Sequence, residues 1–230
     1  MRLKGSARLM VIVALTAACG LSQTKERSWL SGPYLGQKPP GMTPEVFGPR
    51  ILSRIEPEWA YCTEFSSDGS EFYFTEVDPA TRIPRIMTMR RIAGAWTAPE
   101  AAPFSGVHRD NDVRLAPSGK AIFWRSWRPL PGNIEPEERS VIWFAERLGV
   151  GWSEARPVTC GKAFLTAGYP SVTNDGTLYF CARFEGGMGE TDVYFSRFKN
   201  GVYAAPVNIG PAVNSEGGEG DLYVAPDESF

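Results

Sequence analysis

Histidine and cysteine are scarce in this chain of 230 residues, which holds one histidine, His108, and four cysteines. A single histidine argues against metal sites built on two histidines, and it leaves a serine–histidine–aspartate triad only one candidate base. The chain also has no P-loop, dinucleotide-binding glycine motif, nucleophile elbow, Cys-x-x-Cys or His-Glu-x-x-His motif. The sequence therefore predicts no cofactor, no metal ion and no catalytic residue.

An excess of charge of one sign is missing as well, because 24 Lys and Arg stand against 26 Asp and Glu. Surfaces that bind nucleic acid are strongly basic, so we expect no nucleic-acid partner. Apolar residues make up 43% of the chain and charged residues 22%, which argues against a disordered chain. Aromatic residues are abundant at 12%, together with 24 Gly and 19 Pro. This combination is typical of short strands joined by turns.

The first 25 residues contain no acid. Three basic residues, Arg2, Lys4 and Arg8, precede a short apolar run over 9–15. A basic start, a short apolar run and small residues before a cleavage point are typical of a secretory signal peptide. The run is too short to cross a bilayer as a helix, which takes about 20 apolar residues. We therefore predict an exported chain with a signal peptide over 1–18.

Small residues stand directly before Cys19 in the stretch Leu15-Thr16-Ala17-Ala18-Cys19, which resembles the lipobox of bacterial lipoproteins. The resemblance implies cleavage before Cys19, diacylation of this residue and a membrane as partner through the lipid anchor. Gly20 follows instead of Asp, so the periplasmic side of the outer membrane is the expected location in a host with two membranes. An ordinary signal peptide with a chance cysteine is the alternative. Cleavage would remove three bases and no acid, leaving 21 basic and 26 acidic residues.

Four segments of the remaining chain share one pattern: an apolar residue, a turn centred on Asp-Gly or a similar pair, and a three-residue apolar run. They cover 65–75, 115–125, 172–181 and 224–230. Asp-Gly between apolar runs is a hairpin signal. In the first three, a second apolar strand and a Gly-aromatic-Pro signature follow in the same order, and Tyr73, Phe123 and Tyr179 lie 50 and 56 residues apart. A period of about 50 residues with four strands is typical of a propeller blade.

The stretch 65–74 resembles the WD40-like repeat of TolB-type propellers, whose core is Ser-Pro-Asp-Gly before a Tyr-Phe strand. The stretch 190–215, which includes Asn208-Ile209-Gly210 and Val213-Asn214-Ser215, is similar to the rest of that repeat. The resemblance covers about 58–230 and implies an all-β propeller of four-stranded blades. The chain departs from the pattern with Ser118 in place of Asp, with Glu228 in place of Gly, and with a longer second blade over 129–139.

The expected organisation is a signal peptide over 1–18, a tether over 19–42 and propeller repeats over 43–230. The repeats comprise at least three full blades and the first strand of a fourth, Leu222 to Ala225. A propeller needs at least four blades, so we expect a ring that is incomplete at the C-terminal end of this chain. A truncated chain and an open array of four units are the two interpretations. The segment 43–53 would supply the outer strand of the last blade.

Three thiols besides Cys19 can form at most one disulfide. Cys160 and Cys181 are the favoured pair because both fall near the same repeat boundary. Three buried thiols that pack as small apolar side chains are an equally good interpretation.

Aromatic and arginine residues gather after the apolar runs of the second and third repeats. Trp127 with Arg125 and Arg128, and Arg183 with Phe184, would form a binding platform, since aromatic faces beside Arg suit sugar rings or peptides. Packing between blades is the alternative.

Two further groups of candidate residues precede the first strands of the repeats. His108 is either a general base flanked by acids or a loop residue with local hydrogen bonds. The acids would lie on one rim near the central channel, to ring a cation or meet a basic partner, or would remain solvated. They are Asp110, Asp112, Glu216, Glu219 and Asp221.

The sequence thus favours a lipid-anchored propeller of the bacterial cell envelope that binds a protein or a glycan. A propeller-based polysaccharide lyase or glycosidase, and a non-functional remnant, are the alternatives. Binding is favoured over catalysis because no nucleophile or acid–base motif is present, although one fold hosts many functions.

Overall fold

The computed structural model describes residues 30–49, 51–52 and 60–229. These residues form β-strands and loops, with one 3-10 turn, η2 (Tyr34–Gly36), and no α-helix among them. The predicted all-β class is confirmed. Within the described ranges, no helix is long and apolar enough to span a bilayer. The predicted signal peptide, Cys19 and the first part of the predicted tether lie outside the described residues.

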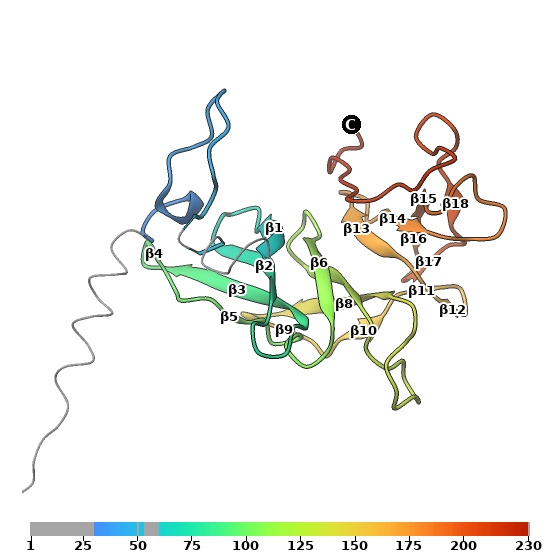
Figure 1. The fold of residues 1–230 in the computed structure, drawn as a ribbon, viewed down its shortest axis with the longest axis horizontal. Coiled ribbons are helices and arrows are strands. Elements are labelled where there is room, and N and C mark those ends of the chain that lie inside the picture. Colours follow the sequence, from blue (N-terminus) through green and yellow to red (C-terminus); the bar gives the residue numbers. More distant parts are fainter. Residues whose placement is uncertain (1–29, 50, 53–59, 230) are drawn as a thin grey trace, which may run out of the picture.

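Three antiparallel sheets follow one another along the chain (Figure 1). The first contains β1 (Ala60–Phe65), β2 (Glu71–Val77), β3 (Pro84–Ile92) and β5 (Glu100–Ala101), with β4 (Ala95–Trp96) paired to the end of β3. The second contains β6 (Asp110–Leu115), β7 (Ala121–Ser126), β8 (Val141–Leu148) and β10 (Arg156–Pro157), with β9 (Gly151–Trp152) on β8. The third contains β13 (Gly168–Val172), β14 (Leu178–Ala182), β15 (Asp192–Ser196) and β18 (Val207–Asn208).

A smaller fourth sheet joins the outer parts of the second and third repeats. Its strands, in spatial order, are β12 (Ala163–Phe164), β11 (Thr159–Cys160), β17 (Val202–Tyr203) and β16 (Phe198–Lys199). The β11–β17 pair is parallel and the other two pairs are antiparallel. This sheet ties the segment that leaves the second repeat to the outer hairpin of the third.

The first strand of each large sheet is bulged at the same point. The register shifts after Tyr61 in β1, after Asn111 in β6 and after Gly168 in β13. The residue that follows each of these has a left-handed backbone: φ is 49° at Cys62, 54° at Asp112 and 52° at Tyr169. Asp221, which lies 52 residues after Tyr169, has φ 48°. A bulge bends the strand and re-aims a side chain, so the repeat extends to the backbone of single residues.

The turn that follows each first strand repeats as well. Gly69, Gly119 and Gly176 have φ between 63° and 83°, and Glu228 takes the same position with φ 59°. In the first turn, the Asp68 carboxylate accepts hydrogen bonds from the hydroxyls of Ser66 and Ser70 and from the Ser70 amide. These bonds stabilise the anion and hold the pKa of Asp68 at about 2. Turn chemistry predicted from sequence is thus formed in the structure.

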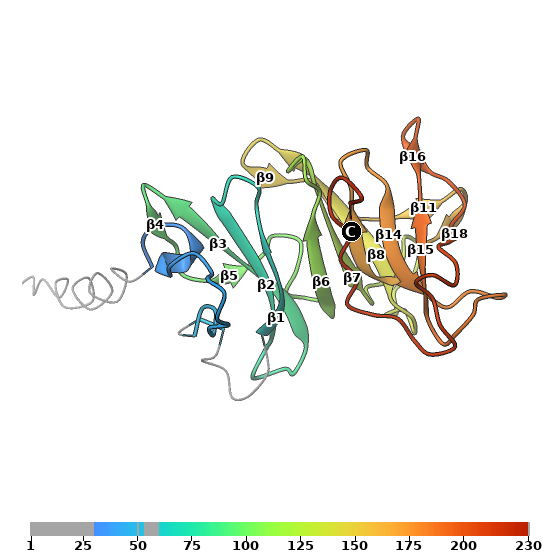
Figure 2. The same cartoon turned by 90° about the horizontal axis from the view of Figure 1, so that it is seen from above.

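Apolar side chains pack between successive sheets, in two clusters of buried residues. The cluster between the first and second sheets includes Tyr73, Ile86, Phe104, Ile122, Trp124 and Trp143. The cluster between the second and third sheets includes Phe123, Ile142, Leu178, Phe180 and Tyr194. Because successive strand residues point to opposite faces, the neighbours Phe123 and Trp124 of β7 contribute to different clusters. The sheets therefore stack face to face in a row (Figure 2).

Part of the predicted tether contacts the first sheet. Leu30 and Leu35 are buried with Trp96, whose indole Nε1 donates to the Gly32 carbonyl at 2.8 Å. Farther along, Phe47 lies edge-on to the rings of Phe65 and Phe72, at centroid distances of 5.9 Å. The described residues of 43–53 form no strand. This N-terminal segment therefore covers the outer face of the first sheet.

The segment 222–225, predicted as the first strand of a fourth repeat, is not assigned as a strand. It runs beside β13: the Val224 amide donates to Ser171 Oγ at 3.0 Å, and the Asn174 amide donates to the Pro226 carbonyl at 2.7 Å. In the same way β6 contacts both β1 and β13. The first and third sheets lie at opposite ends of the row, and the described sheets do not close into a ring (Figures 1 and 2).

The favoured disulfide is wrong, because Cys62, Cys160 and Cys181 are all free thiols. Cys160 lies on β11 of the small sheet, whereas Cys181 lies on β14 of the third large sheet. Burial raises the pKa of Cys160 and raises that of Cys181 to about 12. Both side chains are therefore protonated at neutral pH.

Candidate functional site

A depression of about 340 Å³ lies where the end of β7 meets the beginning of β13. We call it the Arg125 site and define it by Arg125, Trp127, Arg139, Tyr169 and Arg183, all of which line it. Three of these five were candidates from the sequence. Arg125 faces the third sheet because it follows the buried Trp124 on the opposite face of β7.

Arg125 is held by contacts on several sides. Its Nε donates to Ser140 Oγ at 2.8 Å, and that hydroxyl donates in turn to the Ala167 carbonyl at 3.1 Å. The guanidinium carbon lies 5.4 Å from the centre of the Tyr169 ring. A Cβ on Gly168 would lie 2.9 Å from Arg125 Nε, so the glycine leaves the space in which the guanidinium lies. These contacts fix the guanidinium between the second and third sheets.

Trp127 carries two guanidinium groups on its indole ring. The guanidinium carbon of Arg109 lies 4.2 Å from the ring centre, and that of Arg125 lies 4.6 Å from it. Cation–π contacts of this kind are worth about 0.5–1 kcal/mol where the groups are exposed. The sequence predicted an aromatic platform, whereas the ring is occupied by cations. Its role in the site is to orient arginine side chains.

The charges that line the depression are mostly positive. Arg139 and Arg183 are exposed and form no ion pair with any described residue, while Glu138 is the one acid in the lining. Guanidinium groups bind carboxylates and phosphates through two parallel hydrogen bonds. The arrangement therefore suits an anionic group, in a chain whose net charge is −2.

Asp112 lies behind Arg125 at the bulge of β6 and is only 7% exposed. Its Oδ1 accepts a hydrogen bond from Cys62 Sγ at 3.2 Å, and its Oδ2 lies 3.6 Å from Arg125 Nη1, which is longer than a hydrogen bond. Burial raises the pKa of Asp112, and the nearby Asp221 charge adds to this effect, while Cys62 and Arg125 oppose it. Burial and Asp112 raise the pKa of Cys62 to about 12, so the thiol stays a donor.

Arg128 and Asp110 form a buried ion pair away from the depression. Arg128 Nη2 lies 2.9 Å from both carboxylate oxygens of Asp110 and donates to the Phe104 carbonyl at 2.8 Å. Its guanidinium carbon lies 5.2 Å from the Trp124 ring centre and 5.0 Å from that of Trp143. The pair joins β6 to the segment after β7 and faces the core.

Phe184 also packs inside the fold. Its ring lies edge-on to Tyr194 at 4.8 Å and to Phe180 at 6.5 Å between centroids. His108 is half-buried in the loop before β6 and is not part of the lining of the Arg125 site. The structure thus separates these two candidates from Arg125, Trp127 and Arg183.

The predicted rim acids are engaged in different ways. Glu219 Oε1 accepts a bond from the Ser215 amide at 3.1 Å, and Asp221 acts on Asp112 through its charge. Among the described residues, no three His, Cys, Asp or Glu side chains are placed to hold a metal ion.

Tyr169, Arg139 and Ser140 belong to the site but were not candidates. Tyr169 occupies the position in its repeat that Asp112 occupies in the second, so aligning the repeats on their turn glycines, Gly119 and Gly176, would have found it. Arg139 is the last residue of the insertion over 129–139 and Ser140 follows it, and the other repeats offer no counterpart of this insertion.

No protein-family model matches this chain, and no curated protein matches its sequence.

Proposed function

We propose that this protein is an exported, lipid-anchored β-propeller of the bacterial cell envelope whose Arg125 site binds an acidic glycan. The observation that carries the proposal is the set of arginines at one depression. Arg125 is fixed by Ser140 and Trp127, and the exposed Arg139 and Arg183 have no ion-pair partner among the described residues.

The propeller assignment is supported by the structural repeat. Three sheets share one strand order, a bulge in the first strand and a left-handed residue in that bulge, and Asp221 repeats the left-handed residue before the fourth turn. This repetition supports our proposal of three blades of a TolB-type propeller and the start of a fourth. Export and anchoring at Cys19 are proposed from the sequence of residues 1–19 alone.

The size of the depression supports a small acidic group as ligand. Small-molecule sites occupy about 300–1,000 Å³, and the Arg125 site, at about 340 Å³, suits one or two sugar rings. A uronic acid supplies one carboxylate per ring, which matches arginine geometry. Tyr169 would contact the ring, because it lines the depression and its own ring centre lies 5.4 Å from the Arg125 guanidinium carbon.

The protonation state of Tyr169 favours binding over a lyase reaction. A tyrosine that abstracts a proton needs a lowered pKa, whereas burial and the Asp112 charge raise the pKa of Tyr169. The neutral phenol is a hydrogen-bond donor at physiological pH. The described residues of the site can therefore bind a carboxylate, but Tyr169 is not activated to remove the proton from the carbon next to that carboxylate.

Calorimetric titration of the purified full chain with trigalacturonate, with maltotriose as the neutral control, tests the proposal. We expect saturable binding of trigalacturonate alone. The double variant Arg139→Gln/Arg183→Gln should weaken it at least about tenfold, since two charge-assisted contacts are lost. Lys162→Gln removes one exposed charge elsewhere and should leave binding unchanged. Equal binding of both sugars, or no binding, would contradict the proposal, and release of unsaturated products would favour the lyase.

A further inference from the structure

Four side chains join the first sheet to the second. Arg147 of β8 donates to Glu71 of β2, with an Nη1–Oε1 distance of 2.9 Å. Its guanidinium carbon lies 3.8 Å from the ring centre of Trp152 on β9, and Trp152 Nε1 donates to the Tyr73 hydroxyl at 3.2 Å. An ion pair and a hydrogen bond thus cross from one sheet to the other.

The strand register identifies the counterparts of these residues between the second and third sheets. Phe198 pairs with Tyr203 as Arg147 pairs with Trp152. Tyr73 pairs with Glu64, two residues after the left-handed residue of β1. Phe123 pairs with Arg114, two residues after the left-handed residue of β6. In order, Arg147, Trp152, Tyr73 and Glu71 correspond to Phe198, Tyr203, Phe123 and Ala121.

Three of the replacements remove the groups that cross between the sheets. Phe198 has no charge, Ala121 has no carboxylate to receive one, and Phe123 lacks the hydroxyl that Tyr73 offers to Trp152. The second and third sheets are therefore not joined by these contacts, and a cavity of about 550 Å³ lies between them. We call it the intersheet cavity.

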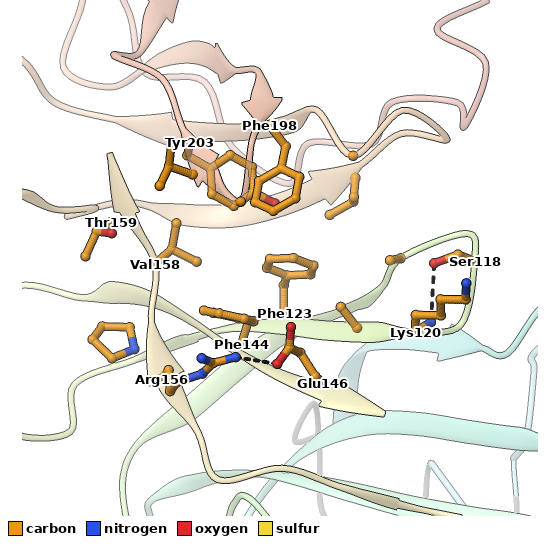
Figure 3. Close-up of a pocket in the computed structure, with 17 residues that line it drawn as sticks. Ser118, Lys120, Phe123, Phe144, Glu146, Arg156, Val158, Thr159, Phe198 and Tyr203 are labelled. Carbon is orange, nitrogen blue, oxygen red and sulfur yellow. Dashed lines mark hydrogen bonds and ion pairs between the residues drawn. The ribbon is translucent and has the colours of Figure 1, made fainter. Parts of the chain in front are cut away.

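Aromatic rings form the two walls of the intersheet cavity (Figure 3). Phe198 and Tyr203 lie on one side, with ring centroids 4.9 Å apart. Phe123 and Phe144 lie on the other side, stacked at 5.8 Å with an angle of 20° between their planes. Phe198 remains 45% exposed although it borders this apolar space. A flat apolar molecule between the walls would cover it.

The charged residues at the edge of the cavity leave one positive charge without a partner. Arg156 and Glu146 pair with each other. Lys120 is exposed, and its ammonium group forms no ion pair with any described residue. Figure 3 shows Lys120 and Ser118 at one end of the cavity and Thr159 at the other. The apolar walls and this lysine suit a ligand with a ring system and an acidic end.

We propose that the intersheet cavity binds a planar aromatic molecule that carries a carboxylate. The rings lie between Phe198 and Phe123, and the carboxylate meets Lys120. The volume falls within the range of small-molecule sites, in which apolar and aromatic walls bury the ligand and a few polar groups orient it. The site is separate from the Arg125 site, so the two proposals stand or fall independently.

Titration of the full chain with 2-naphthoate, followed by ligand-observed NMR, tests the proposal. We expect saturable binding with a Kd of about 1 mM or tighter, and binding of the neutral 2-naphthamide about tenfold weaker. Lys120→Gln should abolish this difference. Absence of saturable binding, or equal affinity for the acid and the amide, would overturn the proposal.

A second variant tests the location of the site. The pair Ala121→Glu/Phe198→Arg copies the ion pair of the first interface into the cavity, so 2-naphthoate should bind at least about tenfold more weakly. The unfolding transition should stay as in the original chain, which would show that the fold is intact. Val150→Arg adds a charge at an 86% exposed position outside the cavity and should bind 2-naphthoate normally. Undiminished binding to the double variant would place the ligand elsewhere and overturn the proposal.

Discussion

Arg128 Nη2 lies 2.9 Å from each carboxylate oxygen of Asp110, whose side chain is fully buried. The contact joins the first strand of the second sheet to the segment that leaves its second strand. Ser105 Oγ also donates to Asp110, at 2.8 Å. Removing one of the two charged side chains would leave the other buried without its counterion, which is energetically costly.

Removing one partner of this pair should destabilise the fold strongly. Asp110→Ala leaves the Arg128 guanidinium buried without its anion, and we expect the free energy of unfolding to fall by about 3–5 kcal/mol. Urea denaturation followed by tryptophan fluorescence measures it. Glu146→Ala is the matched control, because its ion pair with Arg156 is more than half exposed and should contribute less than about 1 kcal/mol. Equal losses in the two variants would contradict this account of Asp110.

The first and second turns allow an exchange experiment. Asp68 accepts several hydrogen bonds, whereas the Ser118 hydroxyl accepts a single one from the Lys120 amide, at 3.3 Å. Asp68→Ser should lower the free energy of unfolding by about 1 kcal/mol, and Ser118→Asp should raise it by about the same amount. Urea denaturation of both variants against the original chain measures the two changes. Opposite signs are the expected outcome, and a loss in both would show that the turns differ in more than this side chain.

The contribution of Asp68 should depend on pH. Its pKa is about 2 in the folded chain and about 3.9 in an unfolded one, so the folded state favours the anion. The stability it supplies is complete above about pH 4 and is lost as the pH falls toward 2. The difference between the original chain and Asp68→Ser should therefore be constant from pH 5 to 8 and shrink in acid. A difference that grows in acid would reverse the assigned sign.

Gly168 should control the position of Arg125. A methyl group at this residue would lie 2.9 Å from Arg125 Nε, and the guanidinium would have to move. We expect Gly168→Ala to weaken trigalacturonate binding about five- to tenfold, with a loss of stability below about 1 kcal/mol, because the displaced atoms are the end of a flexible side chain. Gly151→Ala is the control, since its nearest neighbour would be 3.8 Å away. Unchanged binding in Gly168→Ala would argue that Arg125 does not contact the ligand.

Anchoring can be tested apart from the fold. Cys19→Ser removes the residue that the lipobox resemblance assigns to acylation, so the protein should move from the membrane fraction to the soluble fraction of a bacterial host. Cell fractionation with an antibody to the folded region measures this. Ser22→Ala, close by in the sequence, should stay with the membrane. Membrane association that survives Cys19→Ser would exclude lipidation as the anchor.

The repeated sheets could be predicted because hairpin turns and apolar runs are local signals. Asp68-Gly69 and Asp175-Gly176 mark their turns without knowledge of any distant residue. The boundary of the folded part was harder to place, since Leu30 and Leu35 are buried in a cluster that includes Trp96, more than 60 residues away. Local composition around these two residues contains no trace of that cluster.

The site was predictable in part for the same reason. Arg125 and Trp127 lie close to each other along the chain and meet in the structure. Arg128 is next to Trp127 in sequence, yet its partner Asp110 lies on another strand. Whether the Arg128 side chain enters the core or the depression depends on how the chain turns after β7. The disulfide prediction failed similarly: closeness to one repeat boundary says nothing about which sheet each of Cys160 and Cys181 enters.

The left-handed residue that recurs in each repeat determines where the chain can accept a new functional group. Cys62, Asp112, Tyr169 and Asp221 share a backbone conformation with φ from 48° to 54°, but their side chains are a thiol, a carboxylate, a phenol and a carboxylate. At the first three residues the bulge and the neighbouring strands hold this conformation, which costs about 1 kcal/mol or more for any residue other than glycine. A substitution there exchanges one functional group for another on an unaltered scaffold. These four positions are therefore where new chemistry can be introduced with the least disturbance to the sheets.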